Sequence, residues 1–116
     1  MTFESEFYEQ DMDVFKGTDV PVIVTITNAT TSIATWTFAF TVRRRAGDSA
    51  TPIFTKTTGF VINDTDKTVS FTIADELTNS VRIRQYYWDL KRTDTDNEKI
   101  VASGNFNLLG TAATPA

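Results

Sequence analysis

The chain has 116 residues, 41% of them hydrophobic and 22% charged, which suits one soluble globular domain and argues against a disordered segment. It contains no Cys and no His, which excludes disulfides and thiolate zinc sites and removes the usual general base at neutral pH. The 15 acidic residues outnumber the 11 basic ones, and the resulting net charge of −4 opposes non-specific binding to nucleic acid.

The two ends of the chain differ from its body. Residues 1–10 are acidic and carry Phe3, Phe7 and Tyr8 as apolar points, and residues 109–116 are mostly small. The first residues lack the basic start and apolar run of a secretory signal, and no apolar run is long enough to cross a bilayer. We therefore expect synthesis in the cytoplasm and no membrane association. We interpret residues 1–10 as an arm and 109–116 as a tail. Two alternatives stay open for these ends: they pack on their own domain, or, as we predict, residues 1–10 or 109–116 contact another chain.

Between the ends, β-branched and aromatic residues alternate with polar ones, the period of two expected for a strand with one buried face. Five such runs occur, at residues 22–27, 36–42, 69–73, 86–91 and 100–108. Two weaker runs lie at 12–15 and 53–56, and the second is predicted at a sheet edge because Pro52 cannot donate to a ladder. In the last strong run the alternation places Ile100 inside and Val101 outside.

Turn residues punctuate these runs. Asn63–Asp66 and Asp94–Glu98 superficially resemble calcium loops, but both lack the required Gly and distant Glu, so we interpret them as turns and expect no metal site. Asp75–Thr78 is predicted to be one helical turn that begins at Asp75 or Ala74. About seven short strands with turns every 8–12 residues predict an all-β fold, an immunoglobulin-like two-sheet antiparallel β-sandwich.

Three stretches together resemble a known family: Phe15–Asp19 before a Val-rich strand, Ile73–Thr78, and Tyr86–Leu90 followed by Ala102–Phe106. They resemble the immunoglobulin-like domains of tailed-bacteriophage virion proteins, including the N-terminal domains of baseplate upper proteins. The resemblance covers residues 11–108. It implies a structural adaptor, present in several copies in a tail, baseplate, neck or capsid surface, that docks other virion proteins and has no catalytic residues or cofactors. Unlike the baseplate proteins, the chain stops after one domain, which leaves a capsid-surface or tail-accessory role open.

Aromatic residues of the penultimate run are expected to be structural. A Tyr that opens this strand after a helical turn is typical of a tyrosine corner, in which the phenol hydroxyl bonds to backbone a few residues upstream. Tyr86 is the candidate for that corner. Trp36 and Trp88 are predicted to face each other in the core rather than to stack on a sugar.

Arginines are expected to gather at one end of the domain, because the strands they flank are antiparallel neighbours in an immunoglobulin-like sandwich. They are Arg43, Arg44, Arg45, Arg82 and Arg84. The alternation directs Arg43 and Arg45 outward, alongside Tyr87. Two interpretations stay open at this stage. The arginines either dock an acidic neighbouring subunit, or they are solvated and paired internally with acids such as Asp48, Asp75 or Glu76.

The leading hypothesis is therefore a non-enzymatic virion protein that binds other virion proteins and copies of itself. The alternative is a carbohydrate-binding or adhesin module, which requires several exposed aromatics on one face. Tyr87, Phe60, Phe3, Phe7 and Tyr8 are the candidates for such a face. Nucleic acid is not an expected partner, because the chain lacks a basic stripe with stacking aromatics.

Overall fold

Within residues 8–26, 31–45 and 51–110, which are the residues that the computed structural model describes, the chain forms nine strands and one short helix. The strands are β1 (Tyr8–Glu9), β2 (Met12–Phe15), β3 (Val20–Thr25), β4 (Phe38–Arg43), β5 (Phe54–Lys56), β6 (Val61–Asn63), β7 (Thr68–Ile73), β8 (Gln85–Arg92) and β9 (Lys99–Leu109), and the helix is α1 (Asp75–Thr78). In this part of the chain, no helix has the length and apolar character that a membrane span requires.

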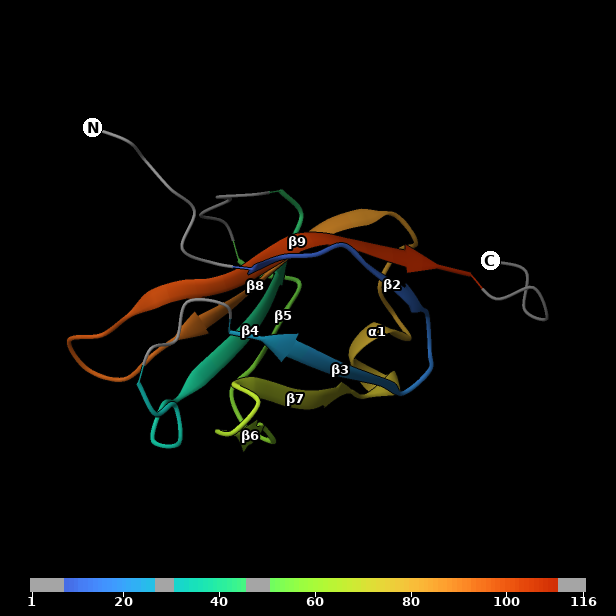
Figure 1. Ribbon diagram of the computed structural model, residues 1–116. Coiled ribbons are helices and arrows are strands. Elements are labelled where there is room, and N and C mark those ends of the chain that lie inside the picture. Colours follow the sequence, from blue (N-terminus) through green and yellow to red (C-terminus); the bar gives the residue numbers. More distant parts are fainter. Residues whose placement is uncertain (1–7, 27–30, 46–50, 111–116) are drawn as a thin grey trace.

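The strands form two sheets that pack face to face (Figure 1). The larger sheet has the order β1-β9-β8-β4-β5, with β2 also paired to β9, and the smaller sheet has the order β3-β7-β6. β4, β8 and β9 are antiparallel neighbours, whereas β1 and β2 run parallel to β9. The order β9-β8-β4-β5 facing β3-β7-β6 is immunoglobulin-like, so the predicted all-β sandwich is confirmed. The parallel pairs of β1 and β2 with β9 depart from the predicted antiparallel arrangement.

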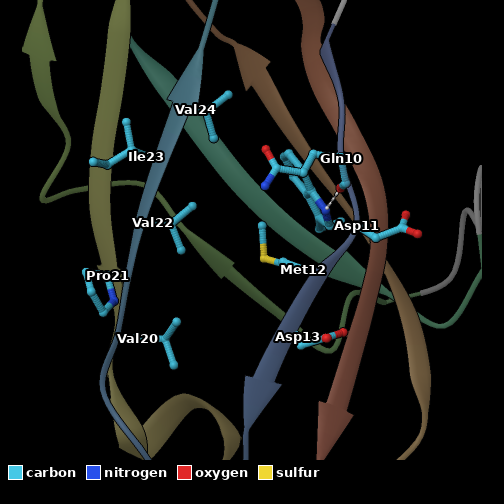
Figure 2. Close-up of a pocket in the computed structure, with 10 residues that line it drawn as sticks. Gln10, Asp11, Met12, Asp13, Val20, Pro21, Val22, Ile23 and Val24 are labelled. Carbon is cyan, nitrogen blue, oxygen red and sulfur yellow. Dashed lines mark hydrogen bonds between the residues drawn. The ribbon is translucent and has the colours of Figure 1, made fainter.

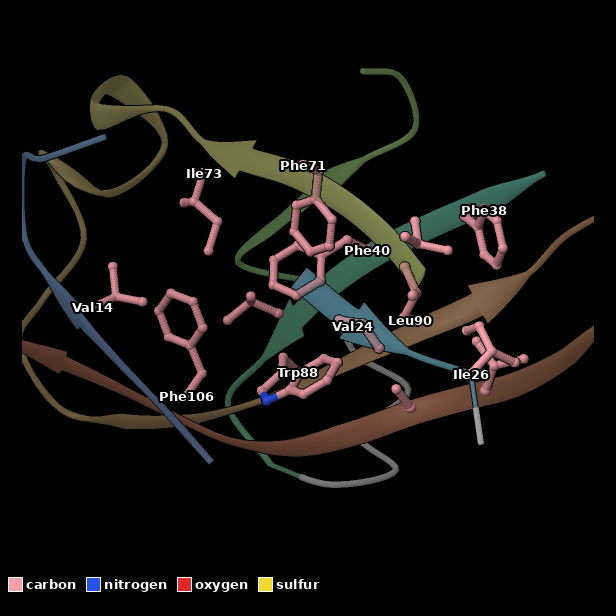
Figure 3. Close-up of a cluster of buried hydrophobic side chains, with 14 of the residues drawn as sticks. Val14, Val24, Ile26, Phe38, Phe40, Phe71, Ile73, Trp88, Leu90 and Phe106 are labelled. Atoms are coloured by element: carbon pink, nitrogen blue, oxygen red, sulfur yellow. The ribbon is translucent and has the colours of Figure 1, made fainter. Parts of the chain in front are cut away.

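The core lies between the sheets and follows the predicted alternation (Figure 3). Phe40 of the larger sheet meets Phe71 of the smaller one with ring centroids 4.7 Å apart, and the Phe40 and Trp88 centroids are 5.8 Å apart. These side chains are almost completely buried. Both tilted pairs supply apolar burial, and the Phe40–Phe71 pair joins the two sheets across the core.

Trp36 does not occupy the position predicted for it. The residue opposite Trp88 on β4 is Val42, and β4 begins only at Phe38. The Trp36 N–H donates to the carbonyl of Ile33, so Trp36 closes a turn and the alternation does not extend back to it. Its half-buried ring packs at the margin of the core, where the Arg92 guanidinium lies 3.8 Å from the ring centroid.

The predicted orientation of Ile100 and Val101 is also wrong. The register between β8 and β9 shifts at Leu90, because Leu90 pairs with Ala102 while Lys91 pairs with Ile100. Val101 is therefore the extra residue of a β-bulge, and it is buried while Ile100 is 36% exposed. A bulge breaks the period of two, so alternation alone mispredicts the residues on one side of it.

Three predictions about the smaller elements are confirmed. β2 has the predicted bounds, β5 is at an edge, and α1 spans Asp75–Thr78 with Ala74 at its N-cap. Sequence alternation does not identify β6 or β1. Because Tyr8 and Glu9 pair with β9, the sandwich begins before residue 11, inside the segment interpreted as an arm.

Candidate protein-binding surfaces

Tyr86 forms the predicted tyrosine corner. Its hydroxyl donates to the Arg82 carbonyl at 2.6 Å, and its ring is 3% exposed. The bond satisfies the phenol and holds the segment that leads from α1 into β8. Tyr86 is thus a structural residue, and it fixes where the neighbouring arginines leave the domain.

A close backbone crossing fastens the N-terminal strands to the larger sheet. The Trp88 indole N–H donates to the Gln10 carbonyl at 2.9 Å, and the Gln10 N–H donates to the Ser103 carbonyl at 2.9 Å. Gly104 lies opposite Trp88, and a Cβ added there would be 1.8 Å from the Gln10 oxygen. Only glycine leaves room for this crossing, which explains the Gly of the Ala102–Phe106 motif physically.

Arg43 is paired within the domain. It donates to the Asp89 carboxylate on the neighbouring strand β8, and both side chains are partly buried on the outer face of the larger sheet. Burial raises the pKa of Asp89 above its usual value, although the Arg43 guanidinium acts in the opposite direction. This geometry matches the internally paired alternative for Arg43. The acid that pairs with Arg43 is Asp89, which was not among the acids considered from the sequence.

The other four arginines, Arg44, Arg45, Arg82 and Arg84, are exposed. β4 ends where β8 begins, with Arg43 opposite Tyr87, so they flank the same end of the larger sheet as predicted. The Arg84 guanidinium lies 5.7 Å from the Tyr86 ring centroid. Within the described residues, none of the four forms an ion pair, and neither Asp75 nor Glu76 does so. Asp48, the third acid considered, lies outside those residues.

Of the aromatic residues considered for the carbohydrate alternative, the structure describes the side chains of Tyr87 and Phe60, and these two do not form one exposed face. Tyr87 is 37% exposed on the outer face of the larger sheet. Phe60 is half-buried, with its ring centroid 5.9 Å from that of Phe38 and 5.3 Å from that of Phe71, so it is not a free aromatic. Tyr8 begins β1, and the predicted roles of Phe3 and Phe7 lie outside the described residues.

The acidic turns are held by hydrogen bonds of their own. Asp64 accepts bonds from the Ser32 hydroxyl, the Ile33 N–H and the Lys67 ammonium, which lower its pKa to about 2, with Lys67 contributing most. Asp94 accepts a bidentate bond from Arg92, and this bond lowers the pKa of Asp94 to about 2. The carboxylates thus tie loops together, as the turn interpretation of both segments predicts.

A groove opens between β2 and β3, where the edges of the two sheets lie side by side (Figure 2). Its volume is about 260 Å³. Met12 from β2 and Val22 and Val24 from β3 point into it (Figure 2), and Trp88 also contributes to its lining. Pro21 and Ile23 project to the opposite side of β3 (Figure 2). The groove thus has an apolar side formed by Met12 and the β3 valines, whereas Gln10, Asp11 and Asp13 add polar groups to its lining. Among the described residues, one wall is an unpaired strand edge.

The outer face of the smaller sheet carries no charged side chain. Ile23 and Val61 are 67% and 66% exposed, and both lie directly opposite Ser70 in the register, so the three form one row across the sheet. Sequence analysis missed this surface, although the order Pro21-Val22-Ile23-Val24-Thr25, with Ile23 on the polar side of the alternation, is a signal that could have shown it.

A scan of the sequence against models of known protein families finds no match, and a search of curated proteins finds none either.

Proposed function

We propose that this protein is a non-enzymatic adaptor of a tailed-phage virion, which docks an acidic surface of another virion protein through the arginine end of its sandwich. The observation that carries the proposal is the set of four exposed arginines, Arg44, Arg45, Arg82 and Arg84, at one end of a chain whose net charge is −4. Planar guanidiniums on a rigid frame suit bidentate pairing with carboxylates of a partner.

The family resemblance supports the virion setting. Its motif residues have defined structural roles, since Tyr86 forms the corner and Gly104 admits the Gln10 backbone. Fold alone does not fix function, so the proposal depends on the arginine end rather than on the sandwich. The tyrosine corner and the antiparallel pairing of β4 with β8 give that end a fixed geometry.

Particles assembled with charge-reversed protein test the proposal. The variant Arg45→Glu with Arg84→Glu is compared with Lys91→Glu with Lys99→Glu, which makes the same change in net charge at exposed residues toward the other end of β8 and β9. Quantitative mass spectrometry of purified particles measures the copies per particle. We expect the arginine variant to lose about tenfold or more of its incorporation and the lysine variant to keep it.

Thermal unfolding of both purified variants controls for folding. We expect both to melt close to the wild-type protein, because the four substituted residues are exposed. Absence of the wild-type protein from purified particles would refute the virion setting. Normal incorporation of the arginine variant would refute docking through this end.

A further inference from the structure

Among the described residues, no strand lies beside the outer edge of β3, which leaves some of its backbone groups without a ladder partner. Ile26 donates to the Lys67 carbonyl, and in the antiparallel register this places Val20, Val22 and Val24 in the pairs that bond to β7. The alternate residues, Pro21, Ile23 and Thr25, therefore direct their backbone groups away from β7, toward the groove side. Pro21 has no N–H, which fits an edge strand, and Ile23 and Thr25 each present a donor and an acceptor.

The other edges among the described residues are guarded. β2 carries Asp13 and follows Asp11, and β1 has only two residues. β5 and β6 have three residues each, and β5 ends on Lys56. β3 has six residues and no charged side chain, and Pro21 is its one residue that hinders pairing with another strand. An exposed, uncharged and apolar edge of this length is a template for pairing with another strand.

The sequence of β3 and the residue after it complements itself. An antiparallel pairing across a two-fold axis at Ile23 places Ile23 opposite its own copy, Val22 opposite Val24, and Val20 opposite Ile26. The Ile23 pair exchanges both backbone bonds, and each Thr25 N–H reaches the Pro21 carbonyl of the other copy. Because Pro21 has no N–H, the Thr25 carbonyl of each copy is the one group without a hydrogen-bond partner in this pairing.

The β3 edge has no charge with which to pair a charged partner segment, and the β3 edge of a second copy is equally uncharged. Each chain carries a net charge of −4, so two copies associate most readily where the contact has no charge, and residues 20–26 have none. On the inner side, Val22 and Val24 of the other copy would enter the groove near Met12. On the outer side, the row formed by Val61, Ser70 and Ile23 would continue into the same row of the other copy.

We propose that two copies of this chain pair antiparallel through their β3 edges, to give a closed dimer with one continuous six-stranded sheet. The pairing deepens the proposed adaptor function by naming one partner, but it uses a different surface from the arginine end. The two proposals therefore fail separately, because the dimer is tested on the purified protein and the arginine end on particles.

Analytical ultracentrifugation of the full chain from about 1 μM to about 1 mM tests the dimer over the range of weak to moderate affinities. We expect the mass to rise toward twice the 13.0 kDa of one chain. Ile23→Lys should stay monomeric across the range, because it places two charges side by side at the axis. Val61→Lys, the matched control on the same face but away from the edge, should dimerise like the wild-type protein.

Amide hydrogen exchange, resolved by NMR over the same concentrations, identifies the surface independently of any variant. The Ile23 and Thr25 amides should exchange about tenfold or more slowly in the dimer, while Val22 and Val24, bonded to β7, are protected at every concentration. A monomeric wild-type protein at all concentrations would overturn the proposal. It would equally fail if a dimer formed with these two amides unchanged, or if folded Ile23→Lys dimerised normally.

Discussion

The two edges that lie side by side in this sandwich, β2 of the larger sheet and β3 of the smaller one, are treated in opposite ways. The chain leading into β2 is fastened by the bonds that join Gln10 to Trp88 and Ser103 over Gly104. Within the part of the chain that the structure describes, β3 has ladder bonds on its β7 side only, and its other side opens on a groove. The N-terminal strands pair with β9 and not with β3, so among the described residues the outer edge of β3 has no strand beside it.

The largest expected effect comes from breaking the fastened edge. Gly104→Ala places a methyl 1.8 Å from a backbone oxygen, so the Gln10 crossing must move. We expect a loss of about 3 kcal/mol, near the upper end for overpacking, and a fall of about 10 °C in melting temperature.

Gly17→Ala is the matched control for Gly104→Ala. Gly17 has φ +74° but nothing within 4 Å of an added Cβ, so only backbone strain applies, at about 1 kcal/mol. If the two variants lost the same free energy of unfolding, the crossing would not be the constraint on Gly104. Chemical denaturation monitored by Trp fluorescence measures both.

A smaller effect is expected at the corner that orients the arginine end. Tyr86→Phe removes one hydroxyl and leaves the Arg82 carbonyl without its partner, at a cost of about 1 kcal/mol. Tyr87→Phe, at an exposed position on the same strand, should change stability by less than about 0.5 kcal/mol. Equal losses of stability in the two variants would show that the Tyr86 hydroxyl bond does not stabilise the fold.

How far the sequence alone predicts this molecule is clearest along β8 and β9. Alternation places Tyr86, Trp88 and Leu90 inside, because one buried face imposes a period of two. It fails at Val101, since a bulge leaves no compositional mark that separates it from an ordinary strand residue. The charge pairing fails similarly, because Asp89 reaches Arg43 only through a diagonal contact between neighbouring strands.

The open edge and the groove are harder still to foresee. They depend on β1 and β2 both pairing with β9 rather than with β3, a choice of partner that the alternation in any single strand does not encode. The expected arginine end required only that two strands be antiparallel neighbours, which the fold class supplies. Surfaces that follow from fold class were thus predicted, whereas surfaces that follow from a particular strand pairing were not.

A still smaller effect concerns the acidic turns that contain Asp64 and Asp94 and should appear only in acid. The folded pKa of Asp64 is about 2, below the ordinary 3.8, so its contribution to stability is complete above the ordinary value and is lost as the pH falls toward 2. Thermal melts at pH 6, 4, 3 and 2 should show this loss. Asp64→Asn should flatten the dependence, and adding Asp94→Asn should flatten it further. An unchanged slope in the double variant would contradict this assignment.

The most direct test of the contrast between the two edges is amide exchange in one dilute sample, at a concentration where the protein is monomeric. The account predicts slow exchange for the Gln10 amide, which donates to Ser103, and fast exchange for the Ile23 and Thr25 amides on the open edge. Equal protection of the three amides, or faster exchange at Gln10, would contradict it.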